Sequence, residues 1–173
     1  MIRSIRRLAP GCKVEVLTPD FRGQEMPLAK VIAERPDVFN HNVETVPRLY
    51  PVARRGSRWE RSLRVLRNAK EMGGDEVVTK SGLMVGLGET FDEMVDALGT
   101  LREHYVQVLT VGQYLRPTER HLPVVRYWHP DEFKGSRTPP TRSASSTSPP
   151  ARSCAPPTTP TSTSSRTGRA SAP

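Results

Sequence analysis

The polar residues best placed for chemistry follow a short apolar run. Asn42 and Glu44 stand at alternate positions after the run that begins at Val38, so on an extended strand their side chains point to the same side. An amide and a carboxylate in that arrangement could hold ribose hydroxyls or an ammonium group. A structural alternative is open at this point: Asn42 could bond to loop backbone, and Glu44 could pair with Arg48.

A second group surrounds two glycines. Gly82, Met84, Gly86 and Glu89 form the pattern Gly-x-Met-x-Gly-x-x-Glu directly after an apolar run. Glycines at such a place usually allow a tight turn or a close backbone approach. The pattern alone therefore does not define a binding site.

The sequence leaves two possible roles for each of two basic side chains. Arg116 could hold a carboxylate or a phosphate, or it could pair with a structural acid such as Glu119. Lys80 could be a buried ion-pair partner or a substrate ligand. No other residues with metal-ligand spacing accompany His41 and His121 in the sequence, so both are expected to be packed or solvated histidines.

The chain has two cysteines, Cys12 and Cys154, with no Cys-x-x-Cys or mixed Cys/His spacing. They predict neither a disulfide framework nor a metal site. The sequence assigns no catalytic residue and no metal ligand to this chain.

The elements that must position these residues alternate along the chain. Strands are expected at residues 13–17, 38–42, 77–85 and 106–111, with helices between them. Capping boxes predict two helix starts, one with Ser57 and Glu60, the other with Thr90 and Glu93. After Thr90 an apolar stripe suited to covering a sheet recurs at helical spacing, formed by Met94, Val95, Leu98 and Leu101. Strict alternation predicts an α/β fold with a parallel sheet, and a site at the carboxyl ends of its strands.

Four segments together resemble the lipoyl synthase family of radical S-adenosylmethionine (SAM) enzymes. They are residues 40–47 (NHNVETVP), 60–63 (ERSL), 79–89 (TKSGLMVGLGE) and 113–117 (QYLRP). The resemblance covers residues 2–134, and it implies the later β/α units of a partial (β/α) barrel. It also implies that Arg116 binds substrate and that six residues contact SAM: Asn42, Glu44, Ser81, Met84, Gly86 and Gln113.

The resemblance implies a sulfurtransferase reaction, but the cysteines that would bind its iron-sulfur clusters are absent from this sequence. Family members insert two sulfur atoms by radical chemistry at C6 and C8 of an octanoyl group, carried by a lipoyl carrier domain or the glycine cleavage H protein. They use SAM and two 4Fe-4S clusters, and a Cys-x-x-x-Cys-x-x-Cys loop holds one of these. This chain has no such loop, so we expect it to be inactive on its own. Alternatives are another sulfur-inserting radical SAM enzyme, such as a biotin synthase relative, or a non-catalytic remnant that binds SAM or the carrier domain.

Composition divides the chain after residue 135. Residues 136–173 contain only Ser, Thr, Pro, Ala, Arg, Gly and Cys, which predicts a disordered tail. Shifted by one base, codons compatible with this tail read Leu-Glu-Asp-Ala-Ala-Tyr-Ala-Leu-Gly-Phe-Val-His-Val-Ala and then Ser-Gly-Pro-Leu-Val-Arg-Ser-Ser-Tyr. This resembles the family's C-terminus and predicts one lost base just after Lys134. A genuine low-complexity tail is the alternative.

Charge follows the same division. The tail holds five of the 26 basic side chains and none of the 18 acidic ones, so residues 1–135 are nearly balanced. That balance gives no reason to expect a nucleic-acid partner. No segment is apolar enough to predict a membrane span or an export signal, and a cytoplasmic location is the default expectation.

Overall fold

The computed structural model describes residues 1–135, which contain one parallel sheet. Its strands are β1 (Glu15–Leu17), β2 (Val38–Asn40), β3 (Val78–Val85) and β4 (Val108–Gln113), in the order β1-β2-β3-β4. All neighbouring pairs are parallel. The four expected strands are confirmed with shifted bounds. The expected disorder of residues 136–173 lies outside the described residues.

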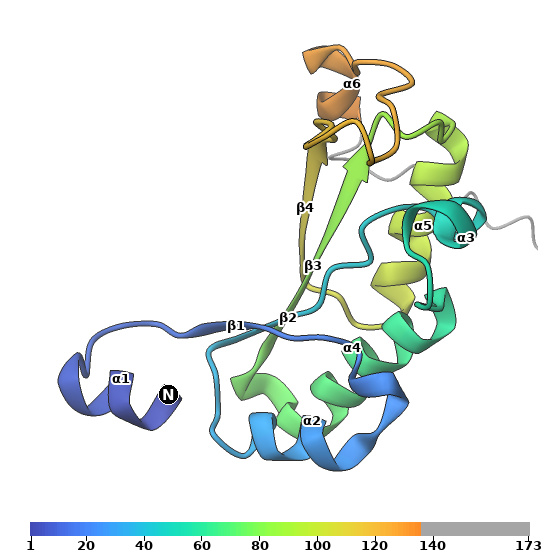
Figure 1. The fold of residues 1–173 in the computed structure, drawn as a ribbon. Helices are drawn as coiled ribbons and strands as arrows, with labels where there is room; N and C mark the ends of the chain where they lie inside the picture. The colour runs from blue at the N-terminus through green and yellow to red at the C-terminus, as the bar shows by residue number, and fades with distance from the viewer. Residues whose placement is uncertain (136–173) are drawn as a thin grey trace, which may run out of the picture. The chain divides into compact units, whose positions relative to one another are not determined.

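Three helices connect successive strands. These are α2 (Glu25–Ile32), α4 (Trp59–Gly73) and α5 (Phe91–Glu103), and all three lie on the same face of the sheet (Figure 1). The shorter elements are α1 (Ile2–Leu8), η1 (Phe21–Gly23), η2 (Pro47–Leu49), α3 (Tyr50–Ala53), η3 (Gly74–Glu76) and α6 (Pro130–Gly135). Four parallel strands in sequential order, the first three each followed by a helix on one face, match consecutive units of a (β/α) barrel. Within residues 1–135 no helix combines the length and apolar character needed to cross a membrane.

The core lies between the sheet and these helices. Phe39 and Val85 on the strands and Leu66 on α4 are fully buried there. On α5, Met94, Ala97 and Leu101 are the buried residues. The expected α5 stripe is therefore confirmed at Met94 and Leu101, whereas Val95 and Leu98 are only partly buried beside it.

The opposite face of the sheet carries no helix from α2, α4 or α5, and we call it the open face. Strand register places Leu17, Asn40, Lys80 and Val108 in one row across it. Leu17 is 66% exposed although it lies within a strand. In a closed barrel this face would be the interior, so the site is sought at its carboxyl end.

The two expected helix starts have different outcomes. The Thr90 capping box is present: its hydroxyl accepts from the Glu93 amide, and the Glu93 carboxylate accepts from the Thr90 amide. The Ser57 capping box is wrong, because α4 begins at Trp59 and no side chain caps it. The amide of Ser57 still belongs to the preceding turn, where it donates to the Arg54 carbonyl.

This difference predicts unequal effects of two similar substitutions. Thr90→Ala should destabilise the fold by about 1 kcal/mol, because it removes an acceptor from an amide at the start of α5. Ser57→Ala is the matched control and should change the free energy of unfolding by less than about 0.5 kcal/mol. Urea unfolding followed by tryptophan fluorescence measures both. Equal effects would contradict the assignment of the two caps.

Candidate functional site

The chain after β2 leaves the sheet and rejoins it with one extra residue. The His41 amide donates to the Lys80 carbonyl at 3.1 Å, and the Glu44 amide donates to the Gly82 carbonyl at 3.0 Å. Three steps along this segment therefore oppose two steps along β3, which is a β-bulge. Within this bulge the backbone of Glu44 adopts the left-handed conformation, with φ 66°. The expected strand to residue 42 is wrong, because β2 ends at Asn40, so strand alternation does not apply to Asn42 and Glu44.

The bulge is fastened to β3 at two further points. The Val43 amide donates to the Ser81 hydroxyl at 3.3 Å, and the Met84 amide donates to the Glu44 carbonyl at 2.8 Å. Ser81 is fully buried on the face that carries the helices. The structure thus gives Ser81 a place behind the bulge. Its contact with SAM stays a prediction.

Gly82 gives the Asn42 amide its position. A Cβ atom on Gly82 would lie 2.7 Å from Asn42 Oδ1 and 3.0 Å from Asn42 Cγ. The Asn42 side chain therefore lies against the β3 backbone in the space that a side chain would need. The structural reason for Gly82 is this close approach.

Asn42 and Glu44 are both half-buried, and their side chains make no hydrogen bond or ion pair within residues 1–135. The structural alternative for them is wrong, because Arg48 binds elsewhere. Its Nε donates to Glu93 Oε1 at 2.6 Å, and a terminal nitrogen donates to the Gly88 carbonyl at 2.8 Å. The bonds that Glu93 accepts from Arg48 and from the Thr90 amide lower the pKa of Glu93 to about 2. An amide and a carboxylate thus remain available beside the carboxyl end of β2.

The turn after β3 is closed by its glutamate. Gly86 has φ 102°, and its amide donates to Glu89 Oε1 at 2.6 Å, while the Leu87 amide donates to Glu89 Oε2 at 2.9 Å. Glu89 is only 5% exposed. Its carboxylate satisfies the amides of the turn, which gives the Gly-x-x-Glu spacing a structural cause.

Gln113 ties a returning segment across the ends of β3 and β4. Its Nε2 donates to the Arg126 carbonyl at 3.2 Å, and its Oε1 accepts from the Trp128 amide at 2.9 Å. The Val125 amide adds a bond to the Gly86 carbonyl at 2.8 Å. Both ends of the Gln113 amide are thus engaged with protein backbone, and its contact with SAM stays a prediction.

Arg116 does not pair with the Glu119 carboxylate. Its Nε donates to the His121 carbonyl at 2.9 Å, and a terminal nitrogen contacts the Glu119 carbonyl. Arg116 is exposed, so its guanidinium reaches solvent next to these backbone acceptors. Its role as a substrate ligand stays a prediction.

A polar cluster on the open face was missed by sequence reasoning. Lys80 Nζ lies 2.9 Å from Glu15 Oε1, and Asn40 Nδ2 donates to the same oxygen at 2.9 Å. The hydrogen bond from Lys80 lowers the pKa of Glu15. Asn40 Oδ1 is buried and has no partner within the described residues. Of the two roles open to Lys80, the structure shows an ion pair, although a partly exposed one.

His41 is a packed histidine, as expected. Its Nδ1 lies 2.9 Å from the Thr18 carbonyl, which can only accept, so Nδ1 carries the hydrogen. Its Nε2 therefore accepts from the Ser62 hydroxyl at 3.0 Å, and the Ser62 oxygen in turn accepts from Arg54 at 3.0 Å. Burial lowers the pKa of His41 below 6.5. This network holds the bulge on the side of α4.

Acid should weaken the fold through His41. As the pH falls below 6.5 the unfolded chain takes up a proton before the folded chain does, so the free energy of unfolding decreases. Urea unfolding between pH of about 7 and about 5 should show this slope in the parent chain and lose it in His41→Gln. The exposed His121→Gln is the control and should keep the slope. An unchanged slope in His41→Gln would refute the assignment.

The described residues do not fit an iron-sulfur cluster. Cys12 is the one free cysteine among them, and it is exposed. No three His, Cys, Asp or Glu side chains within residues 1–135 come together as a metal site. A cluster needs several thiolates at fixed spacing, so no step through a cluster can be assigned to these residues.

Comparison with known proteins gives consistent matches. The sequence profile of the Radical SAM superfamily matches residues 1–101. A lipoyl synthase from Rubrobacter xylanophilus is 61% identical over 132 residues, 76% of this chain and 41% of that protein. Lipoyl synthases from Dichelobacter nodosus and Burkholderia mallei are 53% and 55% identical over 133 and 134 residues.

These matches agree with the resemblance expected over residues 2–134. The chain spans about two-fifths of the length of the lipoyl synthases that it matches. The profile covers β1, β2, β3 and most of α5, the elements that build the bulge and the glutamate-closed turn. The chain therefore belongs to the radical SAM superfamily.

Proposed function

We propose that this chain holds SAM as part of a lipoyl synthase. The parent reaction is the insertion of two sulfur atoms at C6 and C8 of a protein-bound octanoyl group. The names of the similar proteins support this family function. The observation that carries the SAM site is the pair Asn42 and Glu44, whose side chains have no hydrogen bond within residues 1–135 although the bulge and Gly82 hold them in place.

Each residue of the pair has a distinct part in binding. The Glu44 carboxylate accepts from ribose hydroxyls or from the ammonium group of the amino-acid end of SAM. The Asn42 amide donates and accepts at once, so it orients a hydroxyl or a carboxylate. Met84 and Gly86 border this position along β3 and its turn.

Two of the expected ligands act as positioning residues in this proposal. Ser81 holds the Val43 amide behind the bulge. Gln113 holds the returning segment at Arg126 and Trp128. Arg116 would bind an anionic substrate group through nitrogens that now face the His121 and Glu119 carbonyls.

The chemistry and the partners of the parent enzyme extend beyond this chain. SAM supplies the hydrogen-removing chemistry of radical SAM enzymes, and the described residues contribute binding and orientation. Octanoylated lipoyl carrier domains or the glycine cleavage H protein would present the substrate, in the cytoplasm. Because the chain lacks a set of cluster thiolates, we expect it to bind SAM without converting it.

Calorimetric titration of the 173-residue chain with SAM tests the proposal. Saturable binding is expected, with affinity reduced about tenfold in Asn42→Ala and in Glu44→Gln, a loss of about 1.4 kcal/mol each. The matched controls are Asn68→Ala on α4 and Glu103→Gln at the end of α5, which should bind as the parent chain does. No binding at millimolar SAM, or equal losses in the controls, would refute the site.

A non-catalytic SAM-binding remnant is the second candidate. The lone exposed Cys12 among the described residues favours it. Binding without turnover by this chain fits both functions. Turnover after the chain is joined to a lipoyl synthase segment that carries cluster cysteines would favour the enzyme fragment.

A further inference from the structure

The open face of the sheet carries a polar cluster to which the proposed SAM site gives no role. We call Glu15, Asn40 and Lys80 the open-face cluster. Asn40 Nδ2 donates to Glu15 Oε1 at 2.9 Å, and Lys80 Nζ donates to Glu15 Oε1 at 2.9 Å and to Oε2 at 3.0 Å. The charges of Glu15 and Lys80 cancel, so the cluster as a whole is neutral.

Two hydrogen-bonding groups of this cluster are unused. The Asn40 Nδ2 faces a carboxylate, which only accepts, so the orientation of the Asn40 amide is fixed and Oδ1 is the atom without a partner in the described chain. Asn40 is 7% exposed, and an acceptor buried without a partner destabilises the fold until a donor binds it. The Lys80 ammonium has three donors, and two go to Glu15. The cluster thus offers one acceptor and one donor.

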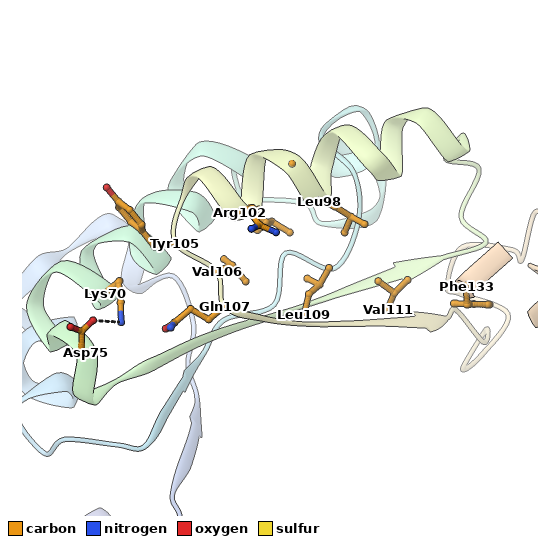
Figure 2. A pocket seen from close by; sticks show the side chains of 12 residues that line it. Lys70, Asp75, Leu98, Arg102, Tyr105, Val106, Gln107, Leu109, Val111 and Phe133 are labelled. Atoms are coloured by element: carbon orange, nitrogen blue, oxygen red, sulfur yellow. Dashed lines mark hydrogen bonds and ion pairs between the residues drawn. The ribbon is translucent and has the colours of Figure 1, made fainter. Parts of the chain in front are cut away.

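Exposed apolar side chains lie on both sides of this polar pair. One row across the open face contains Leu17, Asn40, Lys80 and Val108. Figure 2 shows Leu109 and Val111 of β4 pointing toward α5, so Val108, which alternates with them, points to the open face. Leu17 is 66% exposed and Val108 is 42% exposed. Since neighbouring strands are about 4.8 Å apart, each apolar side chain lies one strand beyond the polar pair.

A secondary amide fits this arrangement. A carboxylate ligand would oppose Asn40 Oδ1 and the Glu15 carboxylate, and an ammonium ligand would oppose Lys80. A secondary amide is neutral, supplies one N–H and one C=O, and carries a carbon chain on each side. An octanoyl group attached to a lysine has this form, with the acyl chain on one side of the amide and the four methylene groups of lysine on the other.

We propose that the open-face cluster binds the amide that joins the octanoyl group to the lysine of its carrier. Asn40 Oδ1 accepts from the amide N–H, and Lys80 Nζ donates to the amide carbonyl. The Lys80 side chain, 23% exposed, shifts to admit the ligand. Leu17 and Val108 pack against the two carbon chains. Glu15 is a positioning residue, because it fixes the Asn40 amide and the Lys80 ammonium.

This inference rests on the proposed function, which supplies an octanoylated lysine as substrate. It uses different side chains from the SAM site, since neither Asn42 nor Glu44 belongs to the open-face cluster. Binding of the acyl-lysine and binding of SAM are therefore measured separately, and each can fail without the other.

The first test needs no variant. A fluorescent peptide that carries Nε-octanoyl-lysine is titrated into the 173-residue chain, and anisotropy is read. The matched peptide has an ester oxygen in place of the amide N–H. The amide peptide should bind saturably and the ester about tenfold more weakly, because the ester oxygen opposes Asn40 Oδ1 instead of donating to it. Equal affinities, or no saturable binding of the amide peptide, would overturn the proposal.

The second test assigns the preference for the amide to one side chain. In Asn40→Leu the two peptides should bind equally, because leucine cannot accept from the N–H. Asn68→Leu is the matched control: the Asn68 amide also donates to a glutamate, Glu25, but it lies on α4. This control should keep the preference for the amide. A preference that survives in Asn40→Leu would place the amide elsewhere and contradict the proposal.

Calorimetric titration with SAM separates this inference from the proposed function. Asn40→Leu should bind SAM as the parent chain does, whereas an equal loss of SAM and peptide binding would assign Asn40 to the SAM site and overturn the proposal. Binding of SAM without binding of the amide peptide would refute the open-face cluster alone. Asn40-dependent binding of the amide peptide without binding of SAM would support the cluster and refute the SAM site.

Discussion

Gly86→Ala is expected to destabilise the fold by about 3 kcal/mol, a large part of the stability of a small domain. Its new Cβ would lie 2.2 Å from Gln113 Nε2 and 2.7 Å from the Arg126 carbonyl oxygen. The carbonyl is backbone and cannot turn away as a side chain can. The φ of 102° adds strain for any residue other than glycine. Loss of the Gln113 contacts would free the segment that crosses the ends of β3 and β4.

Gly99→Ala is the matched control for this result. Gly99 lies inside α5, and a Cβ there meets no atom within 4 Å. Alanine should stabilise the helix by about 0.5 to 1 kcal/mol. Urea unfolding of both variants measures the difference. A free energy of unfolding for Gly86→Ala within about 0.5 kcal/mol of the parent would show that the turn is not fixed as described.

Gly82→Ala is expected to weaken SAM binding at least tenfold while leaving the fold largely intact. The atoms that its Cβ would meet are side-chain atoms, Asn42 Oδ1 at 2.7 Å and Thr110 Oγ1 at 3.3 Å. These can move, so the cost in stability should stay near about 1 kcal/mol. The moved group is the Asn42 amide, and the proposed ligand contact is lost with it.

Calorimetry on the double variant separates this mechanism from a general disturbance. If Gly82→Ala acts through Asn42, adding Asn42→Ala should cause no further loss of affinity. Gly112→Ala on β4 meets no atom within 4 Å and should bind SAM normally. Parent-like affinity in Gly82→Ala, with a loss in Asn42→Ala, would exclude the positioning role of Gly82.

Features that depend on local pattern could be predicted from the amino-acid sequence. Alternating apolar runs and amphipathic stretches predicted a parallel α/β sheet, because strand and helix periodicities differ along the chain. The Thr90 capping box was predictable since both of its bonds join residues three positions apart. The Ser57 pattern looked the same in sequence, but the turn after α3 engages its backbone amide.

Contacts between distant side chains could not be predicted, because they depend on how the elements pack. Glu15, Asn40 and Lys80 come from three strands, and they meet through a register that no single strand encodes. The extra residue in the bulge, which sets Asn42 and Glu44 beside β3, likewise arises only when the two strands pair. Arg48 pairs with Glu93 rather than with Glu44, which is nearer in sequence, because α5 brings the Glu93 carboxylate next to the Arg48 guanidinium. Local sequence fixes periodicity, whereas long-range pairing fixes register, and the candidate site depends on register.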